Sequence, residues 1–600
     1  MSSPAADFTA AQAVAAGIDF AELKVSAAGL VWNEFRPADG ACRLWLWRDQ
    51  QARCLTPDGF SVRSRVYEYG GGSFCFGGDG VVFVNERDQQ LYTQGLDGSA
   101  PSAPSALTDA ADCRYGDVLW HDGRVLAVEE RHGESVTHRL VAIAEGTTHV
   151  LAEGADFYAA PTVSADGQRL AWIEWDRPEQ PWTRTRLMCR DGQTPARCVA
   201  GEDESLQQPG FDAEGRLYCL SDRNGFWQPW GEVDGGWQAL PASMADHAAA
   251  PWQLGASTWL PLGPNSYLAT WFEDGFGQLG LRQDDGEVER FASAYTRFRS
   301  LAADDDHLYA IAASAISPPA VIGIDRVGHQ VRTLAGGAEV LPAERISCPE
   351  PFEYASGDGI AHGFFYPAQN TGAATPLVVF IHGGPTSACY PVLDPRIQYW
   401  TQRGFAVADL NYRGSTGYGR TYRQALHLRW GEVDVQDACA AVAHLAERGL
   451  VDAGKAFIRG GSAGGYTTLC ALAFHDVFRA GCSLYGVSDP LALAQATHKF
   501  EGDYLDWLIG DPEQDAGRYR ERTPLLHAER ITVPVIFFQG ELDAVVVPAQ
   551  TRAMLEALQA NGVEAVGHFY EGERHGLRKA KNLAHALEEE WKFYCRVLGA

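Results

Sequence analysis

Short runs of alternating apolar and polar residues fill the chain from about residue 25 to about residue 340. Asp-Gly and Asn-containing turns separate these runs, and helical patterns are scarce there. Alternation with a period of two is typical of β-strands that bury one face. The first half of the chain is therefore predicted to be all-β.

One phrase in this region returns in degraded form at intervals of about 40 to 50 residues. Each copy has a turn, an inner apolar strand, and a polar turn that leads to another strand. The copies are AAGLVWNEFRPADGACRLWLW, GGDGVVFVNERDQQLY, WHDGRVLAVEER, VSADGQRLAWIEW, FDAEGRLYCLSDRNG, GPNSYLATWFEDG and ADDDHLYAIAAS. This spacing is that of a four-stranded propeller blade, so the seven copies predict a seven-bladed β-propeller. A pair of β-sandwiches with coincidental turns is the alternative.

The pattern changes near residue 345. PLVVFIHGG, FAVADLNYRG and PVIFFQG are continuous apolar runs, as expected of strands that a parallel sheet buries on both faces. Between them, VDVQDACAAVAHLAERG has apolar residues at helical spacing and closes at Gly449. This alternation predicts an α/β domain with a mostly parallel, doubly wound sheet. The predicted parts are a propeller at 25–345, an α/β domain at 346–600, and an N-terminal segment, 1–24, packed on the latter.

The stretch IRGGSAGGYTTLCALAF, residues 458–474, places Ser462 where a predicted strand passes into a predicted helix. Gly460 and Gly464 complete the pattern G-x-S-x-G of a nucleophile elbow, in which strand and helix backbones pass in van der Waals contact. Such a turn lifts the hydroxyl above the sheet and directs the first helical N–H groups at the group attacked. Glycines that serve only tight packing or a phosphate are the alternative.

A serine hydroxyl becomes a nucleophile when a base and an orienting acid support it. Asp543 follows the apolar run VPVIFFQG, and His575 lies in GERHG after another predicted strand. Ser462, Asp543 and His575 thus occur in the chain order of an α/β-hydrolase. Taken singly, Asp543 could cap a helix at 549–560 and His575 could be a solvated loop residue. Together, each at the carboxyl end of a strand, they favour a catalytic triad.

Two glycines follow the predicted strand that ends at Ile381. In VFIHGGPTS, Gly383 and Gly384 leave backbone N–H groups open to an oxyanion. With the N–H of Ala463 they form a predicted oxyanion hole, in which each donor contributes about 3 to 4 kcal/mol in the transition state. A plain turn is the alternative.

These motifs together resemble the prolyl oligopeptidase family of serine peptidases, above all its branch of acylaminoacyl peptidases and dipeptidyl-peptidase-like enzymes. The similar segments are HGGP, NYRGSTGYGRTYR, WGEVDVQDA, GGSAGGY, THKFEGDYLDWLIGDP, QGELD and GERHG, and, in the propeller, VRSRVYEYGGGSF and AWIEWDRPEQPW. The resemblance therefore covers nearly the whole chain. It implies a nucleophile at Ser462, an acid at Asp543, a base at His575, and oxyanion donors at Ala463 and Gly384.

The chain departs from that family pattern at two positions. His382 stands where prolyl-specific and dipeptidyl relatives carry a tyrosine that serves the oxyanion. Backbone amides are therefore expected to suffice here, as in acylaminoacyl peptidases. Val547 replaces a common proline after the acid, and little effect is expected from it.

Two sets of residues are candidates for contact with the substrate. The segment 497–510 resembles the pocket lining of the relatives, so Phe500, Tyr504 and Trp507 are predicted to form its apolar walls, ordinary core aromatics being the alternative. A buried substrate ammonium needs a carboxylate. The pair Glu129 and Glu130 in LAVEERHG, on a predicted blade strand, is the candidate for it, a solvated turn being the alternative.

Composition narrows the partners and the compartment. The formal net charge of −28 disfavours nucleic acid and anionic membranes. The first residues lack the pattern of a signal peptide, and no apolar run reaches the ~20 residues of a membrane helix. The thirteen cysteines are scattered without a C-x-x-C pair, which indicates reduced thiols rather than disulfides or a zinc site.

The sequence as a whole predicts a cytoplasmic serine peptidase that needs no metal or cofactor. It would cleave short peptides through an acyl-enzyme, as an aminopeptidase, dipeptidyl peptidase or acylaminoacyl peptidase, with the propeller limiting access. An esterase or amidase for small acyl compounds, and a propeller scaffold with an inactive hydrolase domain, are the alternatives. The preferred side chain, the state of the substrate's amino terminus, and assembly into a homo-oligomer stay open.

Overall fold

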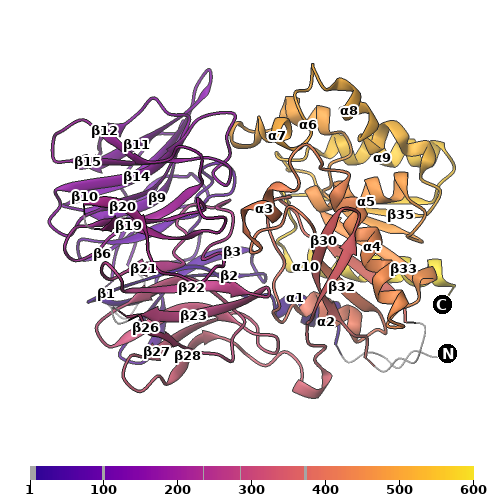
Figure 1. Ribbon diagram of the computed structural model, residues 1–600, viewed down its shortest axis with the longest axis horizontal. Coiled ribbons are helices and arrows are strands. Elements are labelled where there is room, and N and C mark those ends of the chain that lie inside the picture. Colours follow the sequence, from indigo (N-terminus) through magenta and orange to yellow (C-terminus); the bar gives the residue numbers. More distant parts are fainter. Residues whose placement is uncertain (1–7, 97–101, 234, 284–285, 370–374, 600) are drawn as a thin grey trace.

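The computed structural model describes residues 8–96, 102–233, 235–283, 286–369 and 375–599. Its two domains lie side by side, a β domain from the first half of the chain and an α/β domain from the second (Figure 1).

The β domain consists of seven four-stranded antiparallel sheets. The first three are β1–β4 (Asp19–Ser26, Gly29–Arg36, Ala41–Arg48, Gln51–Cys54), β5–β8 (Phe74–Gly77, Gly80–Val84, Leu91–Gly95, Ser105–Ala106) and β9–β12 (Cys113–His121, Arg124–His132, Val136–Ala144, Thr147–Ala152). The next two are β13–β16 (Phe157–Val163, Arg169–Trp175, Arg186–Asp191, Arg197–Ala200) and β17–β20 (Leu206–Phe211, Leu217–Ser221, Gln228–Val233, Gly236–Ala239). The last two are β21–β24 (Trp259–Pro261, Tyr267–Glu273, Phe276–Arg282, Val288–Arg290) and β25–β28 (Arg297–Ala303, His307–Ala313, Ala320–Asp325, Val331–Gly336).

The first strand of each sheet contacts the first strand of the next, and β25 of the seventh sheet contacts β1 of the first. The ring is therefore closed. At the closure the N–H of Leu23 donates to Ser300 Oγ at 2.8 Å, and Arg299 forms an ion pair with Asp19. The predicted seven-bladed propeller is thus confirmed. Its first strand begins at Asp19, earlier than the boundary at residue 25 that the alternating pattern predicted.

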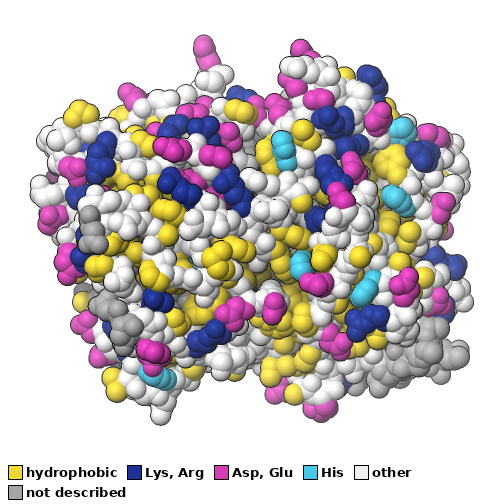
Figure 2. All heavy atoms as spheres, in the orientation of Figure 1, with side chains coloured by type: hydrophobic (Ala, Val, Ile, Leu, Met, Phe, Trp, Pro, Cys, Tyr) yellow, Lys and Arg dark blue, Asp and Glu magenta, His cyan; other side chains and the backbone are white. Residues whose placement is uncertain are grey.

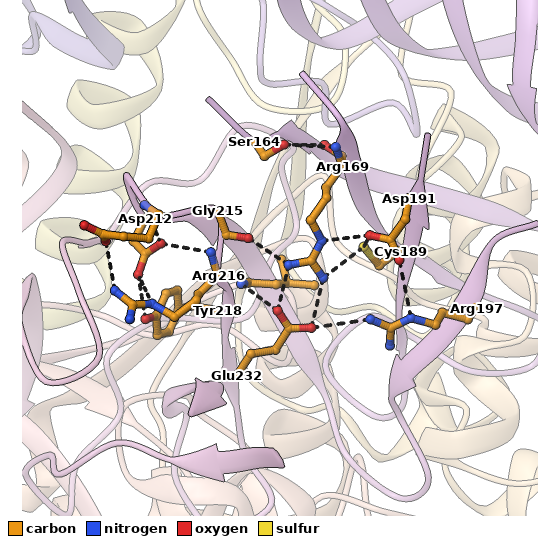
Figure 3. Close-up of polar contacts among 12 residues, drawn as sticks. Ser164, Arg169, Cys189, Asp191, Arg197, Asp212, Gly215, Arg216, Tyr218 and Glu232 are labelled. Carbon is orange, nitrogen blue, oxygen red and sulfur yellow. Dashed lines mark hydrogen bonds and ion pairs between the residues drawn. The ribbon is translucent and has the colours of Figure 1, made fainter. Parts of the chain in front are cut away.

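Ion pairs join neighbouring blades as well as neighbouring strands. Arg169 on β14 pairs with Asp191 on β15 at 2.9 Å and, across to the next blade, with Glu232 on β19 at 2.7 Å (Figure 3). Arg197 on β16 also contacts Glu232, at 3.4 Å. Because the side chain of Arg169 is largely buried, this network fixes the fourth blade against the fifth.

The α/β domain is built on one eight-stranded sheet, in the order β29-β30-β32-β31-β33-β34-β35-β36. Two pairings, β29 with β30 and β30 with β32, are antiparallel, and the other five are parallel. The strands are Glu350–Ser356, Gly359–Tyr366, Leu377–Ile381, Ala406–Asn411, Ala456–Gly461, Gly481–Leu484, Val535–Gly540 and Ala565–Tyr570, numbered β29 to β36 along the chain. This mostly parallel sheet is the one that the continuous apolar runs predicted.

Helices flank this sheet and connect its strands (Figure 1). They are α2 (Pro395–Thr401), α3 (Gly419–Gln424), α4 (Val433–Glu447), α5 (Ala463–Phe474), α6 (Pro490–Ala496), α7 (Tyr504–Leu508), α8 (Ala516–Glu521), α9 (Pro548–Ala560) and α10 (Ala580–Leu598). Short 3-10 helices lie at Ala343–Arg345, Ala453–Lys455, Lys499–Glu501 and Pro524–Arg530.

The N-terminal segment packs on the α/β domain, although it precedes the propeller in the sequence. Helix α1 (Ala10–Ala15) starts at a capping box in which Thr9 and Gln12 bond reciprocally. It packs against α2 and α10 (Figure 1), and Phe8 joins the same buried cluster as Trp400. Residues 1–7 lie outside the described part of the chain. This segment therefore links the two ends of the chain to one core.

The carboxyl ends of the parallel strands face the propeller. Arg423 of α3, which follows β32, forms an ion pair with Asp222 of the propeller, and both side chains are buried. The guanidinium also lies 3.9 Å from the centre of the Trp227 ring. On the face shown in Figure 2, hydrophobic side chains gather along the boundary between the domains. Because catalytic loops in open α/β sheets occupy this same edge, the propeller covers the place where a site is expected.

Candidate active site

Ser462 is the single residue between β33 and α5, at φ 55° and ψ −120°. A non-glycine residue in this region is strained, and such strain is what a nucleophile elbow requires. The flanking glycines show why the turn is possible. A Cβ on Gly460 would lie 2.3 Å from backbone atoms of Gly464, and one on Gly464 would lie 2.2 Å from the carbonyl oxygen of Ile381. Strand and helix therefore touch through backbone alone.

The three residues predicted to form a triad are hydrogen-bonded in series. Ser462 Oγ lies 2.9 Å from His575 Nε2, and His575 Nδ1 lies 2.9 Å from Asp543 Oδ2. A carboxylate only accepts hydrogen bonds, so Nδ1 carries the proton of the neutral ring and Nε2 accepts from the serine. This is the tautomer that a general base needs.

The carboxylate of Asp543 is buried, at 4% exposure, and held by several donors. Its Oδ1 accepts from the N–H groups of Val545 at 2.9 Å and Val546 at 3.0 Å. Its Oδ2 also accepts from Gln539 Nε2 at 3.2 Å, and Thr551 in turn donates to the Gln539 side chain at 2.7 Å. Gln539 was not predicted from the sequence, because a buried glutamine at the end of a strand carries no local signal of its role.

Tyr485 is a second residue that the sequence did not reveal. Its ring packs edge-on against His575, with centroids 5.1 Å apart, and its backbone has a positive φ of 40°. A Cβ on Gly461 would lie 2.9 Å from the tyrosine hydroxyl oxygen. The glycine before the serine therefore leaves room for the ring that supports the histidine.

The predicted oxyanion donors lie around the serine. Ala463 opens α5, and a Cβ on Gly383 would lie 3.6 Å from the Cβ of Ser462, so the loop after β31 rests against the elbow. Within the described part of the chain, no backbone carbonyl accepts from the N–H of Ala463 or of Gly384. The propeller fixes this loop, since Trp252 Nε1 donates to the carbonyl of Thr386 at 2.6 Å.

His382 braces the loop instead of replacing the tyrosine of the relatives. Its Nδ1 lies 2.8 Å from the carbonyl oxygen of Gly383, and its Nε2 lies 2.7 Å from Ser415 Oγ. Burial lowers the pKa of His382 to about 4, so the ring is neutral near pH 7, with its proton on Nδ1. The ring also stacks on Tyr412 at 4.3 Å. Both ring nitrogens of His382 are thus committed to the protein.

The aromatic residues predicted to wall the pocket lie between the domains. Phe500 stacks on Tyr67 of the propeller, with ring centroids 5.1 Å apart. Tyr504 packs against Trp182 at 5.2 Å, and Trp507 stacks on Tyr504 at 6.2 Å. The structure therefore brings all three predicted residues to one aromatic cluster at the interface.

Tyr504 connects this cluster to the oxyanion loop. Its hydroxyl hydrogen-bonds to Thr386 Oγ1, two residues after Gly384. Trp252, which donates to the same threonine's carbonyl, packs against both Tyr504 and Phe500. The cluster thus lies directly beside the loop that would hold the oxyanion.

Glu129 and Glu130 are both buried, but inside the propeller and already paired. Glu129 accepts from Arg139 Nε at 3.1 Å. Burial would raise the pKa of Glu130, but hydrogen bonds from His132 and His138 outweigh it and hold that pKa far below its usual range. A substrate ammonium would have to displace Arg139 from Glu129 and two histidines from Glu130, so the structure argues against the prediction that this pair receives it.

Glu501 is a better placed carboxylate, which sequence reasoning passed over within the segment 497–510. It is buried, accepts a hydrogen bond from the Tyr69 hydroxyl, and lies 4.0 Å from His498 Nε2. Within the described residues, neither Lys nor Arg pairs with it, and both ring nitrogens of His498 are buried without a hydrogen-bond partner. Burial, Glu501 and Asp543 together raise the pKa of Tyr69 well above its usual value.

This arrangement, a serine on a strained elbow bonded through histidine to a buried aspartate on an α/β sheet, defines the class of serine hydrolases with the α/β-hydrolase fold. A profile of the prolyl oligopeptidase family matches residues 391–600. Along nearly the whole chain, the solved structure of a puromycin-hydrolyzing peptidase from Mycobacterium tuberculosis is 34% identical, with 99% of this chain and 96% of that chain covered and a TM-score of 0.94. The chain therefore belongs to the prolyl oligopeptidase family.

Further relatives agree with that placement. A solved puromycin hydrolase is 32% identical over 99% of this chain and 96% of its own, with a TM-score of 0.94. Dipeptidyl aminopeptidase BIII of Pseudoxanthomonas mexicana is 30% identical over 46% of this chain and 43% of its own length. The matched part thus spans less than half of that curated relative. The family resemblance read from the sequence is confirmed.

Two features are absent from the described residues. No group of three or more side chains there has the arrangement of a metal site, and no helix in that part is long and apolar enough to span a bilayer.

The elbow geometry makes a direct prediction for Gly464. In Gly464→Ala the new methyl group would lie 2.2 Å from the Ile381 carbonyl oxygen, so the strand and helix must separate. We expect a loss of about 1 to 3 kcal/mol in the free energy of unfolding and at least a 100-fold loss of turnover. Urea unfolding and hydrolysis of an aminoacyl anilide measure the two effects.

Gly517 provides the matched control. It lies in α8, and a Cβ there would meet no atom within 4 Å. Gly517→Ala should leave turnover unchanged and raise stability by about 0.5 to 1 kcal/mol. Wild-type turnover in Gly464→Ala would show that the close approach is not needed.

Proposed function

We propose that this chain is a serine peptidase that hydrolyses short peptides through an acyl-enzyme. The hydrogen-bonded series Ser462–His575–Asp543 carries the proposal, with both contacts at 2.9 Å. A scaffold with an inactive hydrolase domain would not need a serine on a strained turn that is hydrogen-bonded to a histidine.

In this mechanism Ser462 Oγ attacks the carbonyl carbon of the scissile bond while His575 Nε2 takes its proton. The negative charge that develops on the carbonyl oxygen is stabilised by the N–H groups of Ala463 and Gly384. His575 then gives the proton to the leaving amine, and a water molecule hydrolyses the acyl-enzyme by the same steps. Asp543 holds the imidazole in place and stabilises its charged form.

The substrate class follows from Glu501. A buried carboxylate without a basic partner is costly, and an incoming ammonium would remove that cost. We therefore assign the free α-amine of the substrate to Glu501, with Phe500 and Tyr504 packing against the first side chain. This favours an aminopeptidase or dipeptidyl peptidase over an acylaminoacyl peptidase. The likeness to puromycin-hydrolyzing enzymes supports it, because puromycin is an amide of an amino acid with a free α-amine.

An esterase or amidase for small acyl compounds is the remaining catalytic alternative. Turnover of nitrophenyl esters without turnover of aminoacyl anilides would favour it. For the location, we propose the cytoplasm, because all thirteen cysteines are free thiols, as expected in a reducing compartment.

The nucleophile can be tested by substitution and by labelling. Ser462→Ala should lower the rate of hydrolysis of aminoacyl anilides by at least 1,000-fold. The variant should stay folded, because the glycines rather than the hydroxyl shape the elbow. A fluorophosphonate should label the wild type once per chain and the variant not at all. Residual turnover above a few per cent in a folded Ser462→Ala would contradict the mechanism.

The amine site can be tested with matched substrates. For one anilide, the free-amine form should be hydrolysed faster than its N-acetylated form, and Glu501→Gln should reduce kcat/KM for the free amine by at least tenfold while sparing the acetylated form. Glu130→Gln serves as the control inside the propeller and should alter the ratio of the two rates little. Equal losses on both substrates in Glu501→Gln would remove the assignment.

We further propose that the propeller limits the size of the substrate, because it lies over the edge that carries the triad loops. Peptides up to about 30 residues, the limit that the family resemblance implies, should be cleaved, and intact folded or casein-like proteins should not. A graded peptide series and a denatured protein that share one scissile bond provide the measurement. Equal rates on the denatured protein and the shortest peptide would show that access is not limited.

A further inference from the structure

A cavity of about 520 Å³ lies where α1, the seventh blade and the α/β domain meet. Its charged lining consists of four arginines and three carboxylates: Arg297, Arg299, Arg396, Arg459, Asp19, Asp394 and Glu590. The whole chain carries a formal net charge of −28, so a cavity with more cations than anions is unusual for it.

Three of these arginines are neutralised by the three carboxylates. Arg299 forms an ion pair with Asp19. Arg396 pairs with Asp394 at 2.7 Å. Arg459 pairs with Glu590 at 2.8 Å. Each pair joins one cation to one anion of the same cavity, so the charges cancel pair by pair.

Arg297 is the cation that remains. No carboxylate within the described residues lies within ion-pair distance of it, and its guanidinium instead stacks on the ring of Tyr390, 3.2 Å from the ring centre. Burial lowers the pKa of Arg297, and the nearby Tyr390 and Asp19 offset this effect only in part. A half-buried guanidinium held flat on an aromatic ring presents its N–H groups in a fixed direction.

The cavity is lined by residues that neighbour His575. Tyr485, whose ring packs against His575, and Leu577, two residues further along the chain, both line it. Arg297 and Leu577 also line a second cavity, of about 760 Å³, together with Ser387 of the oxyanion loop. Because this second cavity joins the oxyanion loop to Arg297, a peptide whose leaving part occupied it would come within reach of Arg297.

We propose that Arg297 binds the C-terminal carboxylate of the substrate peptide on the leaving-group side of the scissile bond. A planar guanidinium binds a carboxylate through two parallel hydrogen bonds. The site would favour short peptides with a free C-terminus over amidated peptides and over internal bonds of long chains. This inference rests on the proposed peptidase function, and the experiment below separates the two.

The test uses pairs of peptides that differ only at the C-terminus. X-Gly-Gly acid and X-Gly-Gly amide are compared, where X is the amino acid of the best anilide. The wild type should hydrolyse the acid with a kcat/KM at least tenfold higher than the amide. Arg297→Gln should lower kcat/KM for the acid to the value for the amide. Its kcat/KM for the anilide should stay within about twofold of the wild type, which would show that the triad is intact.

Two variants act as controls. Arg299→Gln removes a neighbouring arginine of the same strand that is already paired with Asp19, and it should keep the preference for the acid. Arg297→Lys keeps a charge without the fork and should keep part of the preference. An equal loss on acid and amide in Arg297→Gln, or a wild type that does not distinguish them, would overturn the proposal.

A binding measurement distinguishes failure of this inference from failure of the proposed function. Titration calorimetry with the inactive Ser462→Ala variant measures peptide binding without turnover. This variant should bind the acid at least tenfold more tightly than the amide. The double variant Ser462→Ala/Arg297→Gln should bind the two peptides equally. If the wild type cleaves no peptide or anilide yet this difference in binding appears, the peptidase assignment is wrong and the carboxylate site stands. If anilides are cleaved and acid and amide bind equally, the carboxylate site is wrong and the peptidase stands.

Discussion

The close passage of two backbones at Ser462 is the constraint on which the rest of the site depends. Gly460 and Gly464 allow β33 and α5 to touch, and Gly464 also lies against the end of β31. The serine therefore stands at a positive φ, above the sheet and beside the loop that follows β31. A larger residue at either glycine would move Ser462 away from both His575 and the proposed oxyanion donors. One contact thus sets the position of groups that come from three different strands.

The propeller completes the site rather than merely covering it. Trp252 donates to the carbonyl of Thr386 and the Tyr504 hydroxyl bonds to its side chain, so both domains hold the loop that contains Gly384. Tyr69 of the propeller likewise holds the carboxylate of Glu501, which the α/β domain supplies. Separation of the domains would therefore release the oxyanion loop and leave Glu501 unpaired. Buried interface pairs such as Arg423 with Asp222 oppose such a separation, because breaking either partner leaves a buried charge.

Most of the architecture and the core of the site could be predicted from the sequence because their signals are local. Each blade repeats the same turns and the same alternation of apolar and polar residues. Ser462, Asp543 and His575 each follow a strand and occur in a fixed order along the chain. Gln539, Tyr485 and Glu501 had no such signal, since their roles come from contacts with residues distant in the sequence. Glu129 and Glu130 illustrate the opposite error. From the sequence, this pair of carboxylates on a strand could bind a substrate ammonium. In the fold, Arg139, His132 and His138 already bond to them.

Glu501 and Arg297, the two charged groups assigned to the ends of a substrate, have a consequence for specificity. Within the described residues Glu501 has no Lys or Arg partner and Arg297 has no carboxylate partner, and one cavity of about 760 Å³ is lined by Arg297 and by Tyr69, whose hydroxyl donates to Glu501. A short peptide with two free termini carries an ammonium at one end and a carboxylate at the other, and so matches both. An internal bond of a long chain offers neither charge at the right distance. Selection for short peptides would then come from electrostatics as well as from the size of the opening, and each end would contribute separately.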